Sequence, residues 1–360
     1  MNNNLEIKIT RAAELKEKPA AETLVFGRCF TDHMFEMDYT EGIGWHDPVI
    51  RPYGPLAMDP ASMVLHYGQA VFEGLKCYRA DDGRLLLFRP EMNFRRLNVS
   101  DERLCIPHID EGFAIKALRA LIAADREWVP SSEGTTLYIR PFVVATEVGV
   151  GVHPSGKYKF IIILSPVGPY YKEGLNPVKI FVEDEYVRAV KGGIGFTKAT
   201  ANYASSLKGQ EKAVKLGYTQ VLWLDAIERK YIEEVGTMNV FFKINGELIT
   251  PSLEGSILPG VTRDSALQLA KSWGVKTIER KISIDEVFAA HENGLLEEAF
   301  GSGTAAVISP IGEFNHGGKA ITISGGKTGA LSKRLYDTLT AIQYGRVKDD
   351  FGWVKEIQCG

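Results

Sequence analysis

Residues 192–206 read GGIGFTKATANYASS and place a single lysine, Lys198, among small and apolar residues. A lysine attacks a carbonyl carbon only as the neutral amine, and apolar surroundings favour that form because they penalise the ammonium ion. The segment therefore makes Lys198 a candidate covalent anchor for a carbonyl group. The competing interpretation is a lysine at the end of a strand whose amine extends into solvent, which is the usual environment of this residue type.

A second candidate group contains two carboxylates directly before a strand-like apolar run. Residues 233–239 read EEVGTMN, so Glu233 and Glu234 come just before the apolar run VFF at 240–242. A carboxylate in such surroundings can hold a pyridinium nitrogen protonated and strengthen the electron sink of a cofactor. Considered in isolation, either glutamate is better explained as part of a solvated hairpin shoulder.

A helix start forms the third candidate group, at residues 258–264, LPGVTRD. The free N–H groups of the first turn, the positive end of the helix dipole and the Thr262 hydroxyl together favour a bound phosphate. Simple capping of the helix explains the same residues. A lysine, a carboxylate and a phosphate-binding helix start are the three groups that hold pyridoxal phosphate, and jointly they are much stronger evidence than singly.

Alternating strand-like and helix-like runs surround these groups and predict an α/β or α+β protein. Runs rich in β-branched and aromatic residues predict strands, and apolar residues at helical spacing, with capping and glycine stop signals, predict helices. The expected strands are 136–146, 159–167, 178–182 and 220–224, with a hairpin that turns at Asn245-Gly246. The expected helices are 113–128, 201–216, one from Pro259-Gly260 to Gly274, one opened by a capping box at Ser283–Glu286, and 329–345.

The chain length and one segment rich in loop-forming residues predict two domains. A chain of 360 residues corresponds to about two domains. The segment GPYYKEGLNP, residues 168–177, concentrates glycine, proline and asparagine between two strand-like runs. We therefore expect a smaller α/β domain at 1–170, a loop at 171–177 and a larger domain at 178–360.

Composition argues against several classes of partner. The 42 Lys and Arg are balanced by 45 Asp and Glu, so the basic surface of a nucleic-acid binder is not expected. No apolar run is long enough to suggest a membrane span. The four cysteines form no CxxC pair, and the first residues lack the apolar core of a signal peptide, so a reducing, cytoplasmic location is expected, without a structural metal.

Two glycine motifs are weak. Residues 301–306, GSGTAA, fit the pattern GxGxxA of a dinucleotide fold, but Pro310 follows where a helix should continue. Residues 326–328, GKT, lack the earlier glycine of a phosphate-wrapping loop, because Ile321 stands in its place. Neither motif predicts a nucleotide site, and the second is interpreted as an exposed loop.

From about Phe35 to the end, the chain resembles the fold-type IV pyridoxal-phosphate enzymes in the order and the sequences of its motifs. The resemblance is specifically to the branched-chain amino acid aminotransferases. The motifs that carry the resemblance are HYGQAVFEGLK (66–76), YIRP (138–141), GFTKATANY (195–203), EVGTMN (234–239), LPGVTR (258–263) and GSGTA (301–305). The resemblance implies a homodimer with pyridoxal phosphate in the cleft between two domains. It also implies ping-pong transamination of L-leucine, L-isoleucine and L-valine with 2-oxoglutarate.

The resemblance also assigns residues that bind the cofactor. Lys198 is similar to the lysine that bonds the cofactor and moves the proton. Glu234, rather than Glu233, matches the acid at the pyridine nitrogen, because it directly precedes Val-Gly-Thr. The other matching positions are Tyr203 at O3′, Arg96 and Thr304 at the phosphate together with the backbone of Val261 and Thr262, Leu258 against the ring, and Thr237.

For the substrate, the resemblance implies an aromatic wall beside an anion-binding arginine. Arg140 matches the arginine that receives the distal carboxylate of glutamate, and the backbone of Thr304 and Ala305 would bind the α-carboxylate. The wall would consist of Tyr67, Phe72, Tyr138 and Tyr170, with Val150 and Val152 donated by a loop to the partner subunit. Considered without the resemblance, Tyr67, Phe72 and Tyr138 are typical core residues.

Two alternatives and one departure remain. A D-amino acid aminotransferase or an aminodeoxychorismate lyase shares the lysine, the glutamate and the phosphate-binding groups, and differs in the substrate wall. Some animal members carry a CxxC pair after the GTA segment, where this chain has Ala306 and Ser309. Thiol regulation of that kind is therefore not expected here.

Overall fold

The computed structural model describes residues 5–168 and 175–357. The chain divides into two compact units, the first comprising residues 1–170, 197–201 and 341–360 and the second residues 171–196 and 202–340. The short segment around Lys198 and the carboxy-terminal residues thus belong to the first unit, although both were predicted in the second domain. Hydrogen bonds explain this, because strand β18 (Val354–Glu356) pairs with β6 (Leu85–Phe88) in the sheet of the first unit.

The first unit is built on a nine-stranded sheet with the order β1, β3, β2, β8, β7, β5, β6 and β18, and β4 also pairs with β7. The central strands β7 (Thr136–Ala145) and β8 (Lys157–Val167) confirm the strands predicted at 136–146 and 159–167. The other strands are β1 (Lys8–Ile9), β2 (His33–Thr40), β3 (Gly44–Pro52), β4 (Ala70–Phe72) and β5 (Leu75–Arg79).

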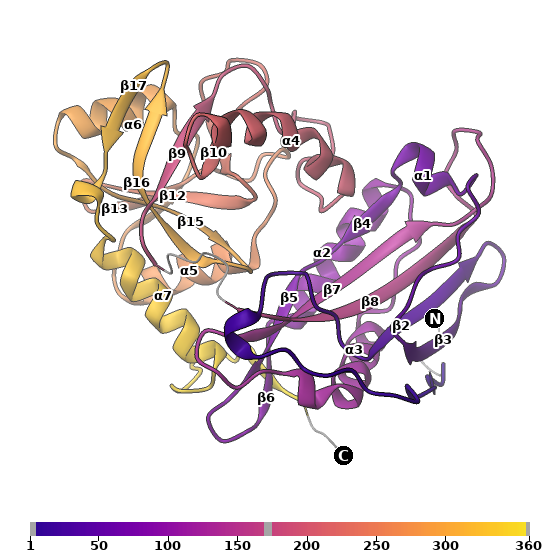
Figure 1. Ribbon diagram of the computed structural model, residues 1–360. Helices are drawn as coiled ribbons and strands as arrows, with labels where there is room; N and C mark the ends of the chain where they lie inside the picture. The colour runs from indigo at the N-terminus through magenta and orange to yellow at the C-terminus, as the bar shows by residue number, and fades with distance from the viewer. Residues whose placement is uncertain (1–4, 169–174, 358–360) are drawn as a thin grey trace. The chain divides into compact units, whose positions relative to one another are not determined.

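Two helices cover one face of this sheet, α2 (Pro90–Arg103) and α3 (Glu111–Ala124) (Figure 1). Their apolar residues pack with those of β2, β7 and β8 in one buried cluster; for example, the rings of Phe35 and Phe113 lie 6.4 Å apart. Helix α3 begins where the Asp110 carboxylate accepts a hydrogen bond from the Phe113 N–H, at 2.7 Å. Because one face is buried under helices, the side chains of the opposite face of β7 are available for a site.

The second unit contains another nine-stranded sheet, with the order β11, β10, β9, β16, β15, β12, β13 and β14 and with β17 paired to β16. Strand β11 also pairs with β12, so six strands close into a ring. The strands are β9 (Val178–Glu183), β10 (Gln220–Leu224), β11 (Ile232–Val235), β12 (Met238–Ile244), β13 (Glu247–Thr250), β14 (Thr277–Glu279), β15 (Leu296–Gly303), β16 (Val307–His316) and β17 (Lys319–Thr322). Strands β9 and β10 confirm the predictions at 178–182 and 220–224.

The helices of this half of the chain also follow the sequence signals. Helices α4 (Thr200–Lys215), α5 (Val261–Ser272), α6 (Ile284–Glu292) and α7 (Ala330–Gln343) lie where helices were predicted (Figure 1). The serine half of the predicted capping box is present, because the Ser283 hydroxyl accepts a hydrogen bond from the Glu286 N–H at 3.1 Å, whereas the Glu286 carboxylate binds Arg280. The hairpin turns at Asn245 and Gly246, whose φ angles of 49° and 76° suit this dipeptide.

Both glycine motifs have the non-nucleotide structures expected of them. Residues 301–306 form the end of β15 and the turn into β16, so a strand rather than a helix follows. Lys327 is exposed in a loop after a short 3-10 turn (Ser324–Gly326). Within the described ranges, no helix combines the length and the apolar character that crossing a bilayer requires.

Candidate active site

Lys198 is held in the first unit by hydrogen bonds of its backbone. Its N–H donates to the Ser100 hydroxyl of α2 at 2.9 Å, and its carbonyl accepts from the N–H of Phe72 at 3.1 Å. Ala199 forms an isolated antiparallel bridge with Val71, so the segment just before α4 lies along β4. The amine of Lys198 lies 4.8 Å from the centre of the Phe72 ring. The lysine is therefore half-buried against an aromatic ring.

Arg140 and Tyr138 lie close to Phe72, the residue whose ring the Lys198 amine contacts. Strand β7 places both side chains on one face, and Phe72 joins them because β4 pairs with β7. The Arg140 guanidinium lies 4.5 Å from the centre of the Phe72 ring and donates from Nη2 to the Tyr138 hydroxyl at 3.1 Å. Its buried Nε has no hydrogen-bond partner among the described residues. This arrangement offers a partly unsatisfied cation at the same aromatic ring that the Lys198 amine contacts.

Gly74 allows this packing. A Cβ atom at Gly74 would lie 2.1 Å from the Tyr138 hydroxyl oxygen, which no real contact allows. The predicted residues Lys198, Phe72, Tyr138 and Arg140 are thus brought together, and Gly74, which was not singled out, makes room for them.

Arg96 is paired with a buried acid that was not predicted. Its Nε and Nη2 atoms donate to the two carboxylate oxygens of Glu73 at 2.6 and 2.9 Å, and the Asn93 amide donates to Glu73 at 2.8 Å. Burial alone would raise the pKa of the Glu73 carboxyl, but Arg96, and more weakly Lys198 and Asn93, lower it below its usual value. The FEG motif therefore supplies a fixed negative charge between the lysine and the arginine.

The remaining predicted substrate residues have different surroundings. The hydroxyl of Tyr67, in α1 (Met63–Tyr67), donates to the carbonyl of Val150. Val150 and Val152 are exposed, at 66% and 83% of their full surface. Tyr170 lies outside the described residues. The loop around Val150 is therefore linked to α1 and exposes apolar side chains.

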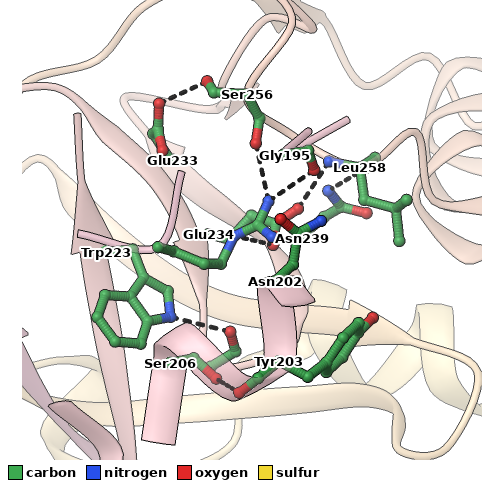
Figure 2. Close-up of polar contacts among 12 residues, drawn as sticks. Gly195, Asn202, Tyr203, Ser206, Trp223, Glu233, Glu234, Asn239, Ser256 and Leu258 are labelled. Carbon is green, nitrogen blue, oxygen red and sulfur yellow. Dashed lines mark hydrogen bonds and ion pairs between the residues drawn. The ribbon is translucent and has the colours of Figure 1, made fainter. Parts of the chain in front are cut away.

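In the second unit, the carboxylate of Glu234 on β11 is held at both oxygens (Figure 2). Its Oε1 accepts from the N–H of Leu258 at 2.8 Å, and its Oε2 lies 2.9 Å from Nε of Arg188. The side chains of Glu234 and Arg188 are both more than nine-tenths buried. Two predicted residues, Glu234 and Leu258, are thus in direct contact. Arg188 was missed, because nothing in its local sequence distinguishes it from a surface arginine.

Asn239 lies next to this carboxylate. It pairs with Glu234 across β11 and β12, so the two side chains lie on the same face of the sheet. Its amide donates to the Leu258 carbonyl at 2.9 Å. A Cβ atom at Gly260 would lie 2.1 Å from Oδ1 of Asn239, so only glycine allows the start of α5 to approach this closely. Gly260 forms no side-chain cap for α5, which leaves the N–H groups of Val261 and Thr262 at an uncapped helix start.

The other predicted cofactor residues lie on neighbouring elements of the second unit. Tyr203 is half-buried in the first turn of α4, and its carbonyl accepts from the Ser206 hydroxyl at 2.8 Å (Figure 2). Thr304 and Ala305 lie in the turn between β15 and β16, after Ser302, which pairs with Asn239. Thr237 is exposed in the turn between β11 and β12.

Glu233 lies on the opposite face of β11 from Glu234, because successive strand residues alternate. Its Oε1 accepts from the Ser256 hydroxyl, whereas its buried Oε2 has no partner among the described residues. Burial raises the pKa of Glu233 to about 7, even though Ser256 and Arg188 oppose the shift. The two neighbouring glutamates thus differ in their surroundings, and only Glu234 contacts a cation at 2.9 Å.

The chain is similar to known proteins in both sequence and structure. Residues 70–314 match the family model of amino-transferase class IV. Branched-chain-amino-acid aminotransferase 2 of Bacillus subtilis is 60% identical over 351 residues, which cover 98% of this chain and 97% of that protein. The branched-chain amino acid aminotransferase of Escherichia coli has a similar structure, with a TM-score of 0.75, 28% identity and coverage of 91% and 99% of the two chains.

A third comparison shows the shared fold alone. The branched-chain amino acid aminotransferase of Thermobaculum terrenum, in its PLP-bound holo-form, has a TM-score of 0.71 at 23% identity and covers 90% of this chain and 98% of its own. The family match and the relatives confirm the predicted two-domain α/β fold of type IV. The chain therefore belongs to the class IV aminotransferases and, within that class, to the branched-chain-amino-acid aminotransferases.

Proposed function

We propose that this protein transfers the amino group of L-leucine, L-isoleucine or L-valine to 2-oxoglutarate, with pyridoxal phosphate as cofactor and in a ping-pong mechanism. The observation that carries the proposal is the group around Lys198. An amine, an aromatic ring and an arginine with an unsatisfied buried donor lie together. The names of the relatives support the substrate class.

The residues present fit pyridoxal phosphate chemically. Glu234 is a buried carboxylate held beside a cation, which suits a protonated pyridine nitrogen. The uncapped start of α5 at Val261 and Thr262 suits a phosphate group. Lys198 is half-buried against Phe72, where its amine can act as a nucleophile. When bound, the cofactor supplies an electron sink for the bonds to the Cα atom of the substrate.

Each side chain then has a defined task. Lys198 would hold the cofactor covalently, and its amine would carry a proton to and from Cα of the substrate. Glu234 would accept a hydrogen bond from the pyridine nitrogen of the cofactor, and Tyr203 would donate one to its O3′ oxygen. The remaining proposed contacts are Leu258 and Thr237 at the ring, and Arg96, Val261, Thr262 and Thr304 at the phosphate.

The substrate site must accept both an apolar and a carboxylate side chain. The aliphatic side chain of the substrate would pack against four aromatic residues, Phe72, Tyr138, Tyr67 and Tyr170. Arg140 would bind the distal carboxylate of glutamate and 2-oxoglutarate, since its guanidinium has an unsatisfied buried donor. The N–H groups of Thr304 and Ala305 would bind the α-carboxylate. The two half-reactions would then use one pocket in opposite directions.

We also propose a cytoplasmic homodimer in which the loop around Val150 reaches the substrate site of the partner. The exposed apolar side chains of Val148, Val150 and Val152 support this, because such groups gain from being covered. Light scattering of the purified protein measures the mass. The dimer requires twice 39.8 kDa, and a monomer at micromolar concentration would contradict it.

A half-reaction tests the chemistry. The protein is purified with pyridoxal phosphate, and its absorption spectrum is recorded before and after L-leucine or D-alanine is added without an acceptor. L-Leucine alone should bleach the yellow band, and 2-oxoglutarate should then restore it. Bleaching by D-alanine instead would establish a D-amino acid aminotransferase. A protein that stays colourless with added cofactor would refute the proposal.

A further inference from the structure

We propose that Arg188 is the positioning residue of the carboxylate that binds the pyridine nitrogen. It keeps Glu234 ionised and fixes its orientation, although Arg188 itself has no contact with substrate or cofactor in this proposal. The inference rests on the proposed function, because it concerns the same carboxylate.

The guanidinium of Arg188 links three segments that carry the cofactor residues. Figure 2 labels its three partners, Glu234, Gly195 and Ser256. Its Nε lies 2.9 Å from Oε2 of Glu234 on β11. Its Nη2 donates to the carbonyl of Gly195 at 3.0 Å and to the carbonyl of Ser256 at 2.8 Å. Gly195 belongs to the GFTKATANY motif that contains Lys198, and Ser256 precedes Leu258 and α5. One buried side chain therefore connects the lysine segment, the acid and the approach to the phosphate-binding helix.

The positive charge of Arg188 compensates the negative charge of the buried Glu234 carboxylate. A carboxylate that is more than nine-tenths buried stays ionised only if a cation or several donors compensate for the lost hydration. Glu233, the preceding residue in the chain, would add repulsion whenever it is ionised. Arg188 is the cation that contacts Glu234, and the Leu258 N–H holds the other oxygen. An ionised Glu234 in one orientation is the state that favours a protonated pyridine nitrogen.

The geometry requires an arginine. The guanidinium donates two hydrogen bonds from Nη2 to the carbonyls of Gly195 and Ser256, and its Nε forms an ion pair with Glu234. A planar guanidinium can place these contacts on different nitrogen atoms, whereas an ammonium is a single point of charge. The backbone is adapted to it as well. A Cβ atom at Gly195 would lie 2.4 Å from the Ser256 carbonyl oxygen, so glycine lets the two carbonyls meet at Arg188. A lysine at position 188 would keep the charge and lose part of the hydrogen bonding.

The test separates positioning from a merely structural role by a double-mutant cycle. The variants are Arg188→Met, Arg188→Lys, Glu234→Gln and the two doubles. For each loaded enzyme we measure the dissociation constant of pyridoxal phosphate, the pH dependence of its absorption band and the rate of the L-leucine half-reaction. Glu234→Gln should slow the half-reaction about 100-fold or more, and Arg188→Met about 10-fold or more.

If Arg188 acts through Glu234, replacing Arg188 should not slow the half-reaction further when Glu234 has already been replaced by the neutral glutamine. The double variant should then match Glu234→Gln within about threefold, instead of showing the product of the two losses. Arg188→Lys should recover part of the rate and keep the wild-type pH profile of the band. A double variant as slow as the product, with an unchanged band in Arg188→Met, would overturn the proposal. If Arg188→Met does not fold, the cycle with Arg188→Lys decides in the same way.

Arg263 provides a matched control. It is equally buried, and its Nη2 donates to the Pro251 carbonyl at 2.8 Å and lies 2.9 Å from Glu279. The fold-loss in half-reaction rate caused by Arg263→Met should multiply with the loss caused by Glu234→Gln. A double variant that departs from this product only when Arg188 is changed therefore supports the positioning role. A wild-type protein without a cofactor band would refute the proposed function, whereas a normal wild type with additive variants would refute only the role of Arg188.

Discussion

The main-chain N–H of Phe72 donates a hydrogen bond to the carbonyl oxygen of Lys198 at 3.1 Å, and the amine of that lysine lies 4.8 Å from the centre of the Phe72 ring. The backbone contact fixes where the lysine leaves the chain. The ring contact gives its amine an apolar side. A short strand thus positions a residue that lies more than a hundred positions later in the sequence.

The first prediction concerns this lysine. Lys198→Ala should abolish transamination and the yellow band, because it removes the amine proposed to form the covalent link. Lys198→Arg keeps the positive charge beside Phe72 and removes the nucleophile, so it should be equally inactive while it stays folded. Turnover is measured with L-leucine and 2-oxoglutarate. An alanine variant with substantial activity would contradict the assignment.

The second prediction concerns Arg140. Arg140→Met should lower kcat/KM for glutamate about 30- to 200-fold, which corresponds to the roughly 2–3 kcal/mol of a charged hydrogen bond. The value for leucine should change less than about fivefold, since a methyl group needs no cation. The ratio of the two kcat/KM values is the measurement. Equal losses for both substrates would show that Arg140 only supports the packing of Tyr138.

The third prediction concerns the pair of Glu73 and Arg96. Glu73→Gln should lower the free energy of unfolding by about 3–5 kcal/mol, because it leaves a buried arginine without its counter-ion. Asp337→Asn, which breaks the exposed pair with Lys333, should cost less than about 1 kcal/mol. Chemical denaturation at pH 7 compares the two variants with the wild type.

The same pair has a defined pH dependence. The pKa of Glu73 is lowered in the folded protein, so the unfolded chain takes up the proton first as the pH falls. The stabilisation is therefore present at neutral pH and is lost in the acid range below the ordinary pKa of 4.5. Glu73→Gln should differ from the wild type at pH 7 and approach it in acid. A difference that stays constant with pH would mean that packing, rather than charge, explains the effect.

The fourth prediction concerns Glu233, whose shift has the opposite sign. Its pKa is raised to about 7 when folded, so between about pH 4.5 and 7 the folded protein holds a proton that the unfolded chain has lost. Stability should fall as the pH rises through this window, by at most about 3 kcal/mol. Glu233→Gln, which carries no charge, should equal the wild type at pH 4.5 and be more stable at pH 8. Equal stability at both values would show that Glu233 is ionised without penalty.

The local part of this protein could be predicted from the sequence. The hairpin at Asn245 and Gly246 and the N-terminal cap of α6 by Ser283 depend on a few neighbouring residues, and both are present in the structure. Pro310 argued against a helix after residues 301–306, and the structure has strand β16 there. The first hundred residues were less readable, in part because strands β5 and β6 are short and buried along almost their whole length, so their sequences show no regular alternation of apolar and polar residues.

What the sequence by itself determined is the set of chemical groups: a lysine in apolar surroundings, a carboxylate before a strand and a helix start that suits phosphate. Their partners are a matter of tertiary structure. Arg188 reaches Glu234 across 46 positions and Glu73 reaches Arg96 across 23, and neither pair has a spacing that a helix or strand repeats. Charges are paired in the interior because an isolated charge there is too costly. Only the folded chain decides which distant residue supplies the counter-ion, and with it which acid stays ionised.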